Sequence, residues 1–566
     1  MKNQISQSLT IFLAIILSLL MISCGSKKDE QMNNEFKEFI KNWETQYIPL
    51  YKEANLAYWD ASISGKKEDF DKVLELQNKI TALFSDKESF EKLKKIKESG
   101  AIKDEIDKRQ LEVLYLAYLG NQIDTSLLNA VNKLQNEIEQ KYTNFRAEVN
   151  GKKLTDNEIE EILTTSKNSK ELQAVWEAHK KIGTVVADDI KQLVKMRNEI
   201  AKKLGFNNYH EMSLKLREQD PNEILKLFDE LDNLTKDAFA KEKENIDKFF
   251  TERYKISKED LMPWHYQNRF FQEAPKIYEV DLDVYYKDKD LVKLTSEYYN
   301  GIGLLIDDII SKSDLFEKPG KNQHAYCTDI DNEGDVRVLC NIKPNEKWMN
   351  TMLHEYGHAV YDKFIDRQLP FSLRDPAHTF TTEAIAQLFG RMATNAKWIK
   401  DMLGIRDEEF NKIKDDCFKS LRLHQLTFSR WSQVMFRFEK SMYENPDQDL
   451  NKLWWDLVEK YQLLKKPEGR NQPDWASKIH IATVPCYYHN YLLGELLASQ
   501  LQNYIVKNII KSDDLINQSF KNNTEVGKYL KEKVFAPGAK YFWNDMIEKA
   551  TGEKLTPKYY AKQFVN

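Results

Sequence analysis

A histidine and glutamate motif is the feature of this sequence with the clearest chemistry. His354 and His358 flank Glu355 in a segment, residues 348–364, whose apolar residues recur at helical spacing. Histidines four positions apart on a helix lie on one face, one turn apart, so both imidazoles can bind one zinc ion. Glu355 is placed to act as general base on a zinc-bound water. A chance H-E-x-x-H in such a chain has a probability on the order of one in a hundred, so two helix histidines without a metal are a weak alternative.

A third protein ligand is needed, because catalytic zinc takes three and keeps a fourth position open. Glu383 begins an apolar stretch with helical spacing after His358. A glutamate at this place also suits a structural role, since a carboxylate stabilises a helix N-terminus. Positions 361 and 364 hold Tyr and Phe, so the third histidine of H-E-x-x-H-x-x-G-x-x-H is missing. The pattern predicts a gluzincin, a two-helix zinc metallopeptidase in which His354, His358 and Glu383 bind the metal.

The elements that must hold these residues are mostly helices. The 566 residues include 19 glycines and 14 prolines, together about 6% of the chain and roughly half of average usage. Sandwiches, propellers and strings of modules need turn residues at regular intervals, so this scarcity argues against them. A hydrophobic share of 41% supplies ample material for a core. The net charge of −5 lacks the basic excess of nucleic-acid-binding domains, so we expect no nucleic-acid partner.

The order of these elements follows from the spacing of apolar residues. Helical spacing runs from Phe36 to about Glu252 and again from Glu346 to the C-terminus. Between these stretches, residues 324–330 and 336–342 predict two β-strands around a turn. We therefore predict an all-α fold with one small β hairpin near the active site. Cys327 and Cys340 flank the turn, so they either form a disulfide or remain two unpaired thiols.

The N-terminus predicts export. Lys2 precedes an apolar run over residues 9–22, and a small residue precedes Cys24. The run of about 14 residues is too short for a comfortable membrane span. Residues 1–24 resemble a bacterial lipoprotein signal, in which Cys24 is acylated; an ordinary secretory signal with an incidental cysteine is the alternative. Residues 25–34 then form a polar tether and 35–566 a single domain, anchored to a membrane at the cell envelope, facing the periplasm or on the cell surface.

Several segments, in order, resemble the family of angiotensin-converting-enzyme-like peptidyl-dipeptidases. The family's H-E-M-G-H helix and later H-E-A-I-G are similar to residues 354–358 and 382–386. Its H-A-S-A-W-D strand, N-G-K-D-F-R turn and K-F-H-I segment are similar to residues 324–329, 332–337 and 478–481. Weaker similarity covers nearly all of residues 35–566. The resemblance implies two helical halves around a deep cleft, one zinc ion per chain, and release of dipeptides from peptide C-termini by attack of a zinc-bound water.

The resemblance also assigns catalytic roles. Glu355 is the general base and then the general acid toward the leaving amine. His480 and a following tyrosine stabilise the oxyanion of the tetrahedral intermediate. Tyr488 and Tyr491 keep the family's Tyr-x-x-Tyr spacing. We therefore assign the stabilisation of the oxyanion to Tyr491, with Tyr487 and Tyr488 as alternatives.

The same resemblance places substrate contacts on both sides of the zinc. Lys478 binds the C-terminal carboxylate of the peptide, with Tyr488 close to it. His324 and Ala325 present strand backbone to an extended peptide, as in β-augmentation. Short or unstructured peptides are therefore the expected substrates.

Three departures from the family limit this transfer. Gln387 stands where the family has an aspartate that supports a zinc histidine. The arginines that hold activating chloride have no counterpart, since residues 487–491 contain none and Val458 follows the Trp454-Trp455 pair. The glutamine that helps grip the substrate C-terminus is also not evident. Chloride activation is therefore not expected, and strict dipeptide release is left open.

Two further expectations concern packing and the other histidines. We predict that Gly357 lets the helix bearing Glu383 approach closely, which would offset a helix-propensity cost of about 1 kcal/mol. Five histidines match no ligand spacing and are expected to be ordinary core or surface residues, although one of them, His378, lies near Glu383 in sequence. These are His179, His210, His265, His378 and His424.

Three functions fit these residues. The first is a zinc peptidyl-dipeptidase acting as a carboxypeptidase of dipeptide units. The second is an oligopeptidase of the thimet or oligoendopeptidase F type, which shares the H-E-x-x-H motif, the distant glutamate and the histidine with tyrosine pair but makes internal cuts. The third is a catalytically silent, peptide-binding surface lipoprotein. The presence together of His354, Glu355, His358, Glu383 and His480 argues against the third.

Overall fold

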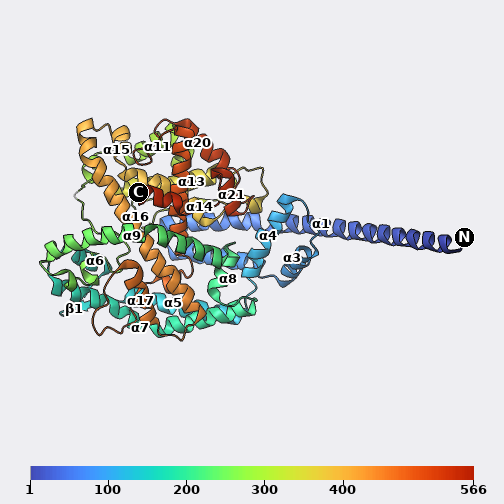
Figure 1. The fold of residues 1–566 in the computed structure, drawn as a ribbon, viewed down its shortest axis with the longest axis horizontal. Coiled ribbons are helices and arrows are strands. Elements are labelled where there is room, and N and C mark those ends of the chain that lie inside the picture. Colours follow the sequence, from blue (N-terminus) through green and yellow to red (C-terminus); the bar gives the residue numbers. More distant parts are fainter. Residues whose placement is uncertain (1, 279, 566) are drawn as a thin grey trace.

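The computed structural model describes residues 2–278 and 280–565, with side chains described from residue 28 onward. The described chain is mostly helical, as predicted (Figure 1). The N-terminal half contains α1 Lys2–Ser64, α2 Lys67–Phe84, α3 Lys87–Ser99, α4 Glu105–Gly120, α5 Thr125–Asn144, α6 Asp156–Thr165, α7 Ser169–Lys203, α8 Tyr209–Leu216 and α9 Pro221–Tyr254. The short helices α10 Asp283–Tyr286, α11 Leu291–Gly301 and α12 Asp307–Lys312 follow.

The C-terminal half holds the motif residues. Its helices are α13 Glu346–Lys363, α14 Thr379–Gly390, α15 Ala396–Leu403, α16 Asp407–Glu444, α17 Leu450–Gln462, α18 His480–Thr483, α19 His489–Tyr504, α20 Thr524–Leu530, α21 Trp543–Thr551 and α22 Lys558–Phe564. A short 3-10 helix, η5 Asp474–Ser477, lies between α17 and α18.

Local sequence signals explain several of the helix starts near the site. Asn345 begins α13 by accepting a hydrogen bond from the backbone N–H of Trp348. His378 begins α14, because its Nδ1 accepts from the N–H of Phe380 at 3.1 Å. Asp220 caps α9, which has Pro221 in its first turn, where proline is favoured.

The strands differ from the prediction in number and length. The expected hairpin exists, but its strands are β3 Tyr326–Asp329 and β4 Val336–Leu339, so His324 and Ala325 lie just before the paired segment. A second hairpin, β1 Ala147–Val149 with β2 Lys152–Leu154, was not predicted. Its turn residues, Asn150 and Gly151, both have positive φ, as the Asn-Gly turn of a two-residue hairpin requires. That dipeptide was a signal the sequence did contain.

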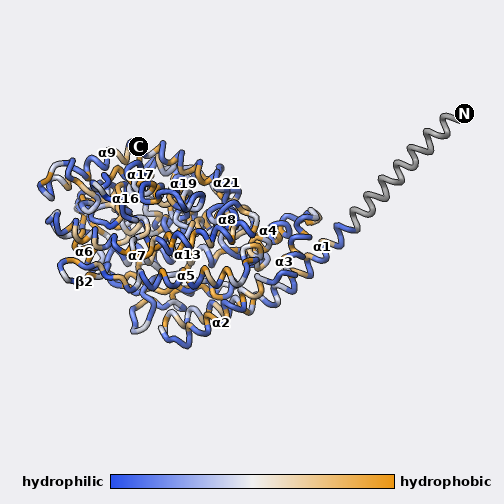
Figure 2. The backbone as a smooth tube through the Cα atoms, turned by 90° about the horizontal axis from the view of Figure 1, so that it is seen from below, coloured by the Kyte–Doolittle hydropathy of each residue, from blue (hydrophilic) through white to orange (hydrophobic). Residues whose placement is uncertain are grey.

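The helices form two groups that share one hydrophobic core. Figure 1 shows α5, α7 and α17 in one group and α11, α13, α14 and α20 in the other, with α9 and the 38-residue α16 between them. One continuous cluster of buried apolar side chains runs through both groups. Figure 2 shows hydrophobic and hydrophilic residues interleaved along the coloured part of the chain, which is the amphipathic pattern the sequence predicted.

The N-terminal helix carries the expected signal and tether. Met32, Phe36 and Trp43 of α1 are buried in a smaller cluster with α3 and α4. Met32 and Asn33, which fall inside the expected tether, therefore already contact the body. The side chain of Cys24, the predicted lipidation site, lies outside the described residues. Among the residues described, none of the helices is both long and apolar enough to span a bilayer.

The possible disulfide does not form. Cys327 pairs in register with Val338, so Cys340 is displaced from it along the hairpin. Both thiols are free, and Cys327 Sγ lies 3.9 Å from the carboxylate of Asp362. Of the two alternatives, the structure has the unpaired thiols.

Candidate active site

The predicted metal ligands converge from two helices. His354 and His358 of α13 and Glu383 of α14 bring one ligand atom each to within 4.8 Å of one another. His354 Nε2 is 3.8 Å from a carboxylate oxygen of Glu383. A 2.7 Å hydrogen bond joins His358 Nδ1 to the hydroxyl of Thr382, which leaves Nε2 for a metal. Two imidazoles and one carboxylate are a catalytic zinc donor set, so these residues fit the predicted ion.

The two helices meet at Gly357. A Cβ atom placed on Gly357 would lie 2.8 Å from Cα of Ala386 and 3.2 Å from the carbonyl oxygen of Ile385, both on α14. Backbone atoms cannot move aside as a side chain can. The structure thus supports the prediction that a glycine here allows the helix bearing Glu383 to approach.

Glu355 lies beside the three predicted metal ligands. The residue is 8% exposed, and the backbone N–H of Cys327 on β3 lies near enough to favour the charged form of its carboxylate. Burial raises the pKa of Glu355 to about 8, and the nearby Glu383 carboxylate acts in the same direction. A carboxylate with a raised pKa is a stronger base, which suits proton abstraction near neutral pH.

Gln387 behaves differently from the aspartate of the resembling family. Its Nε2 donates to the backbone carbonyl of Tyr491 at 3.2 Å, so this side chain ties α14 to α19.

Burial lowers the pKa of His354 to about 4, and the negative charge of Glu495 acts in the opposite direction. The imidazole of His354 is therefore neutral, which is the form that binds a metal.

A second group of predicted residues follows the 3-10 helix η5. Asp474 at its start is 0% exposed, and its carboxylate accepts hydrogen bonds from Trp455 Nε1 at 3.1 Å and from Arg470 at 2.6 and 2.7 Å. Ser477 at its end accepts from Nζ of Lys180 at 3.2 Å. A Cβ atom on Gly183 of α7 would lie 2.3 Å from the carbonyl oxygen of Pro473, so the segment packs directly on that helix. We refer to Asp474, Trp455, Arg470, Ser477 and Lys180 as the η5 clamp.

Lys478 leaves this clamp and enters the interior. It is 7% exposed, and its Nζ donates to Oε1 of Gln272 at 2.5 Å. Burial, followed by the nearby Arg269, lowers its pKa to about 8. The rings of Phe270, Trp431 and Tyr488 lie 5.3, 5.4 and 5.5 Å from Nζ. Sequence reasoning found no glutamine for this place; the structure supplies Gln272, 206 positions away.

His480 and the tyrosines continue from Lys478 toward the metal ligands. The ring of His480 lies 5.4 Å from that of Tyr488, and Tyr488 lies 5.4 Å from Tyr491. Burial lowers the pKa of His480 to about 4, so its imidazole is neutral. Its Nδ1 is buried without a hydrogen-bond partner among the described residues.

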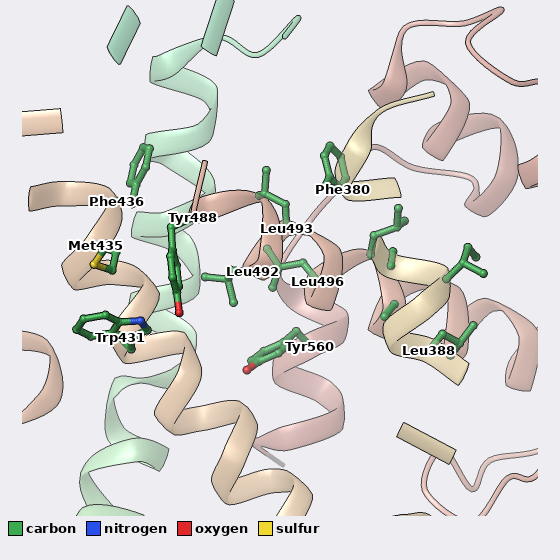
Figure 3. Close-up of a cluster of buried hydrophobic side chains, with 14 of the residues drawn as sticks. Phe380, Leu388, Trp431, Met435, Phe436, Tyr488, Leu492, Leu493, Leu496 and Tyr560 are labelled. Atoms are coloured by element: carbon green, nitrogen blue, oxygen red, sulfur yellow. The ribbon is translucent and has the colours of Figure 1, made fainter. Parts of the chain in front are cut away.

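The three tyrosines of residues 487–491 separate into two groups. Tyr488 is buried between Trp431 and Met435 of α16 and Leu492 of α19 (Figure 3), on the side of Lys478. Tyr487 and Tyr491 lie 5.4 Å apart, ring to ring, and the charge of Glu383 contributes to raising the pKa of both. The phenols of Tyr487 and Tyr491 are therefore the ones near the metal ligands.

A cavity of about 570 Å³ opens beside His354. Its walls come from residues 274–278 and 280–283 and from α13, α14, α16 and α19, and they include Gln387, Glu495 and His424. His424, expected to be an ordinary core or surface residue, is exposed and lies in the wall of this cavity. His378 instead has a structural role: besides capping α14, its Nε2 donates to the carbonyl oxygen of Arg217 at 2.9 Å.

The remaining residues named from the sequence lie in the core or at the edge of the hairpin. His179, His210 and His265 are buried, as expected of core residues. His324 is exposed, and Ala325 is partly buried at the edge of the hairpin. The expectation that both form part of the paired strand was wrong, because hydrogen bonding to β4 begins at Tyr326.

Comparison with known proteins covers almost the whole chain. The family model described as angiotensin-converting enzyme, Peptidase_M2, matches residues 30–559. Angiotensin-converting enzyme of Rattus norvegicus is 23% identical over 440 residues, 72% of this chain and 33% of the relative, and that of Haematobia irritans exigua is 23% identical over 450 residues, 72% of each. Carboxypeptidase 1 of Bacillus subtilis is 25% identical over 268 residues, 43% of this chain and 52% of the relative.

The extent of these matches is uneven. The chain spans about a third of the length of the mammalian relatives, whereas it spans about three quarters of the insect one. The family model, by contrast, includes the metal ligands, the η5 clamp and all three tyrosines of residues 487–491. This chain therefore belongs to the angiotensin-converting enzyme family, Peptidase_M2.

Proposed function

We propose that this protein is a zinc metallopeptidase that releases dipeptides from the free C-termini of short or unstructured peptides. The observation that carries the proposal is a pair of sites. The metal-ligand group of His354, His358 and Glu383 stands beside the general base Glu355, and Lys478 lies in the same interior, joined to it through Tyr488 and Tyr491. Because Lys478 binds the C-terminal carboxylate at a fixed distance from the metal, that distance determines how many residues of the peptide follow the cleaved bond.

The zinc held by these three ligands would polarise the carbonyl of the cleaved bond and make water a stronger nucleophile. Glu355 takes the proton of the attacking water on a carboxylate oxygen and then transfers it to the leaving amine. The backbone N–H of Cys327 lies near this carboxylate and favours its charged form. Neutral His480 and the phenol of Tyr491 donate hydrogen bonds to the oxyanion that forms.

The C-terminal carboxylate of the peptide pairs with the ammonium group of Lys478. Gln272 holds the ammonium in position through its Oε1 and keeps an amide N–H₂ that can donate to the same carboxylate. The phenol of Tyr488 lies on the same side and adds a further donor. A buried cation with fixed donors favours a free carboxylate over a continuing peptide chain, which supports dipeptide release over the internal cuts of the oligopeptidase alternative.

A decapeptide digestion tests this function. The protein lacking residues 1–24 is loaded with zinc, and the fragments are identified by mass. Successive loss of dipeptides from the C-terminus is expected, with activity removed by a chelator and restored by zinc. Internal fragments as first products would instead favour the oligopeptidase alternative.

We further propose that the protein is exported and anchored through a lipid on Cys24, as a bacterial lipoprotein at the cell envelope. The residues that precede the body, an apolar run ending before Cys24, support this proposal. Metabolic labelling with a radioactive fatty acid should mark the natural chain, and Cys24→Ala should remove the label. A labelled Cys24→Ala protein would contradict the anchor.

A further inference from the structure

The cavity beside His354 adjoins the proposed carboxylate site. Gln272, which contacts Lys478, is followed in the chain by Glu273, and the next residue, Ala274, is already part of the cavity wall. Glu273 acts electrostatically on Lys478 and Tyr488 and also on His424 in the opposite wall. Glu273 is not itself part of the cavity wall; it lies in the chain between Gln272, at the carboxylate site, and Ala274, in the wall.

This cavity is rich in hydrogen-bond acceptors. The carboxylates of Asp281, Asp283, Glu346 and Glu495 line it, against the two cations Lys276 and Arg391. Arg391 is already paired with Glu495. Glu273 is exposed, its Oε1 lies 3.5 Å from Nε2 of Gln272, and it forms no ion pair within 4.0 Å among the described side chains. The carboxylate of Glu273, next to the cavity, is therefore available to pair with a positively charged ligand.

From these contacts we propose that the cavity receives the side chain of the substrate's C-terminal residue and selects lysine or arginine there, with Glu273 as the main selecting group. The inference rests on the proposed dipeptide release. A cavity of about 570 Å³ admits any natural side chain, so its charge and its acceptors decide the preference. Lysine brings three N–H donors and arginine five, both on long stems that reach inward from a carboxylate held at Lys478.

The test compares peptides that differ only in the last residue: lysine, Nε-acetyl-lysine, leucine or aspartate. Acetyl-lysine is the closest control, because it keeps the whole lysine side chain and replaces the charged ammonium by a neutral amide. We expect kcat/KM for the lysine peptide to exceed that for acetyl-lysine by about tenfold or more, and aspartate to be the poorest. Equal values for lysine and acetyl-lysine would overturn the inference.

Variants assign the preference to the cavity. Glu273→Gln should bring the ratio of lysine to acetyl-lysine near one, and Glu273→Lys should raise the relative rate for aspartate. Glu468→Gln, at an exposed glutamate outside the cavity wall, is the matched control and should keep the wild-type ratio. An unchanged ratio in Glu273→Gln would also overturn the inference.

The two proposals fail in different ways. If dipeptides are released at equal rates whatever the last residue, the side-chain preference is wrong and dipeptide release stands. If none of these peptides loses a dipeptide, dipeptide release is wrong and the preference fails with it.

Discussion

The residues proposed to bind the metal and those proposed to hold the substrate are positioned in opposite ways. His354, His358 and Glu383 lie within 30 positions, on two consecutive helices that meet at a glycine. Lys478 is placed by the η5 clamp, whose members come from three separate regions of the chain, and it contacts Gln272 from a fourth. The proposed metal ligands are thus positioned by residues near them in sequence, whereas the proposed substrate contacts are positioned by residues far apart in sequence. Substitutions in the two regions should therefore have different effects on catalysis, zinc binding and substrate binding.

The largest effect is expected at the metal region. Glu355→Gln keeps the shape of the side chain but cannot take a proton, so kcat should fall by about 10²–10⁴. Zinc content, measured by atomic absorption, should stay at one ion per chain because none of the ligands is altered. Full activity of a zinc-loaded Glu355→Gln protein would contradict the role of Glu355.

A pair of tyrosine variants separates the two phenols near Glu383. Loss of one oxyanion donor typically costs about 10²–10³ in kcat. Tyr491→Phe should show a loss of this order, and Tyr487→Phe, its matched control, should change kcat by less than about threefold. The reverse outcome would transfer the oxyanion role to Tyr487. Circular dichroism melts check that both variants remain folded.

The close approach at Gly357 gives a packing test of the same region. Gly357→Ala forces apart two helices whose backbones are in contact, so zinc affinity should fall by about tenfold or more. Gly120→Ala is the control, since its new methyl group would meet only the flexible tip of Leu216 at 3.4 Å. Equal zinc affinity in both variants would show that the contact at Gly357 is unimportant.

A substitution in the η5 clamp should instead weaken substrate binding. Asp474→Asn removes the charge that faces Arg470 and Lys180, and breaking such a buried pair destabilises a protein by about 3–5 kcal/mol. If the fold survives, KM for free-carboxylate peptides should rise by about tenfold while zinc content is unchanged. A variant that loses zinc but keeps KM would contradict the separation of the two regions.

What the sequence could predict follows the same division. The helical fold, the three metal ligands and Glu355 follow from helical periodicity and one motif, because residues four apart share a helix face whatever the rest of the chain does. Gln272 and Asp474 carry no local signal, since their partners lie elsewhere in the sequence. The place of His424 in a cavity wall carries no local signal either, because the other walls come from residues 274–278 and 280–283 and from α13, α14 and α19.

The smallest expected effect is a pH dependence that belongs to the substrate region. Burial lowers the pKa of Lys478 to about 8, so its ammonium form is present below that pH and is lost above it. The value of kcat/KM for a peptide with a free C-terminus should therefore decline above about pH 8. Lys478→Arg, which keeps its charge, should move this decline to higher pH. An identical profile in the variant would assign the decline to another group.

We propose that the zinc ion and the ammonium group of Lys478 bind the same peptide at once. A pair of decapeptides tests this most directly. The two have the same sequence and differ only in a free or an amidated C-terminus. Rates of cleavage and fragment masses are measured with the zinc-loaded protein. We predict dipeptide release from the free form and at least about a hundredfold slower cleavage of the amide, because the amide cannot pair with Lys478. Equal rates, with both peptides cut at the same internal bond, would contradict the account.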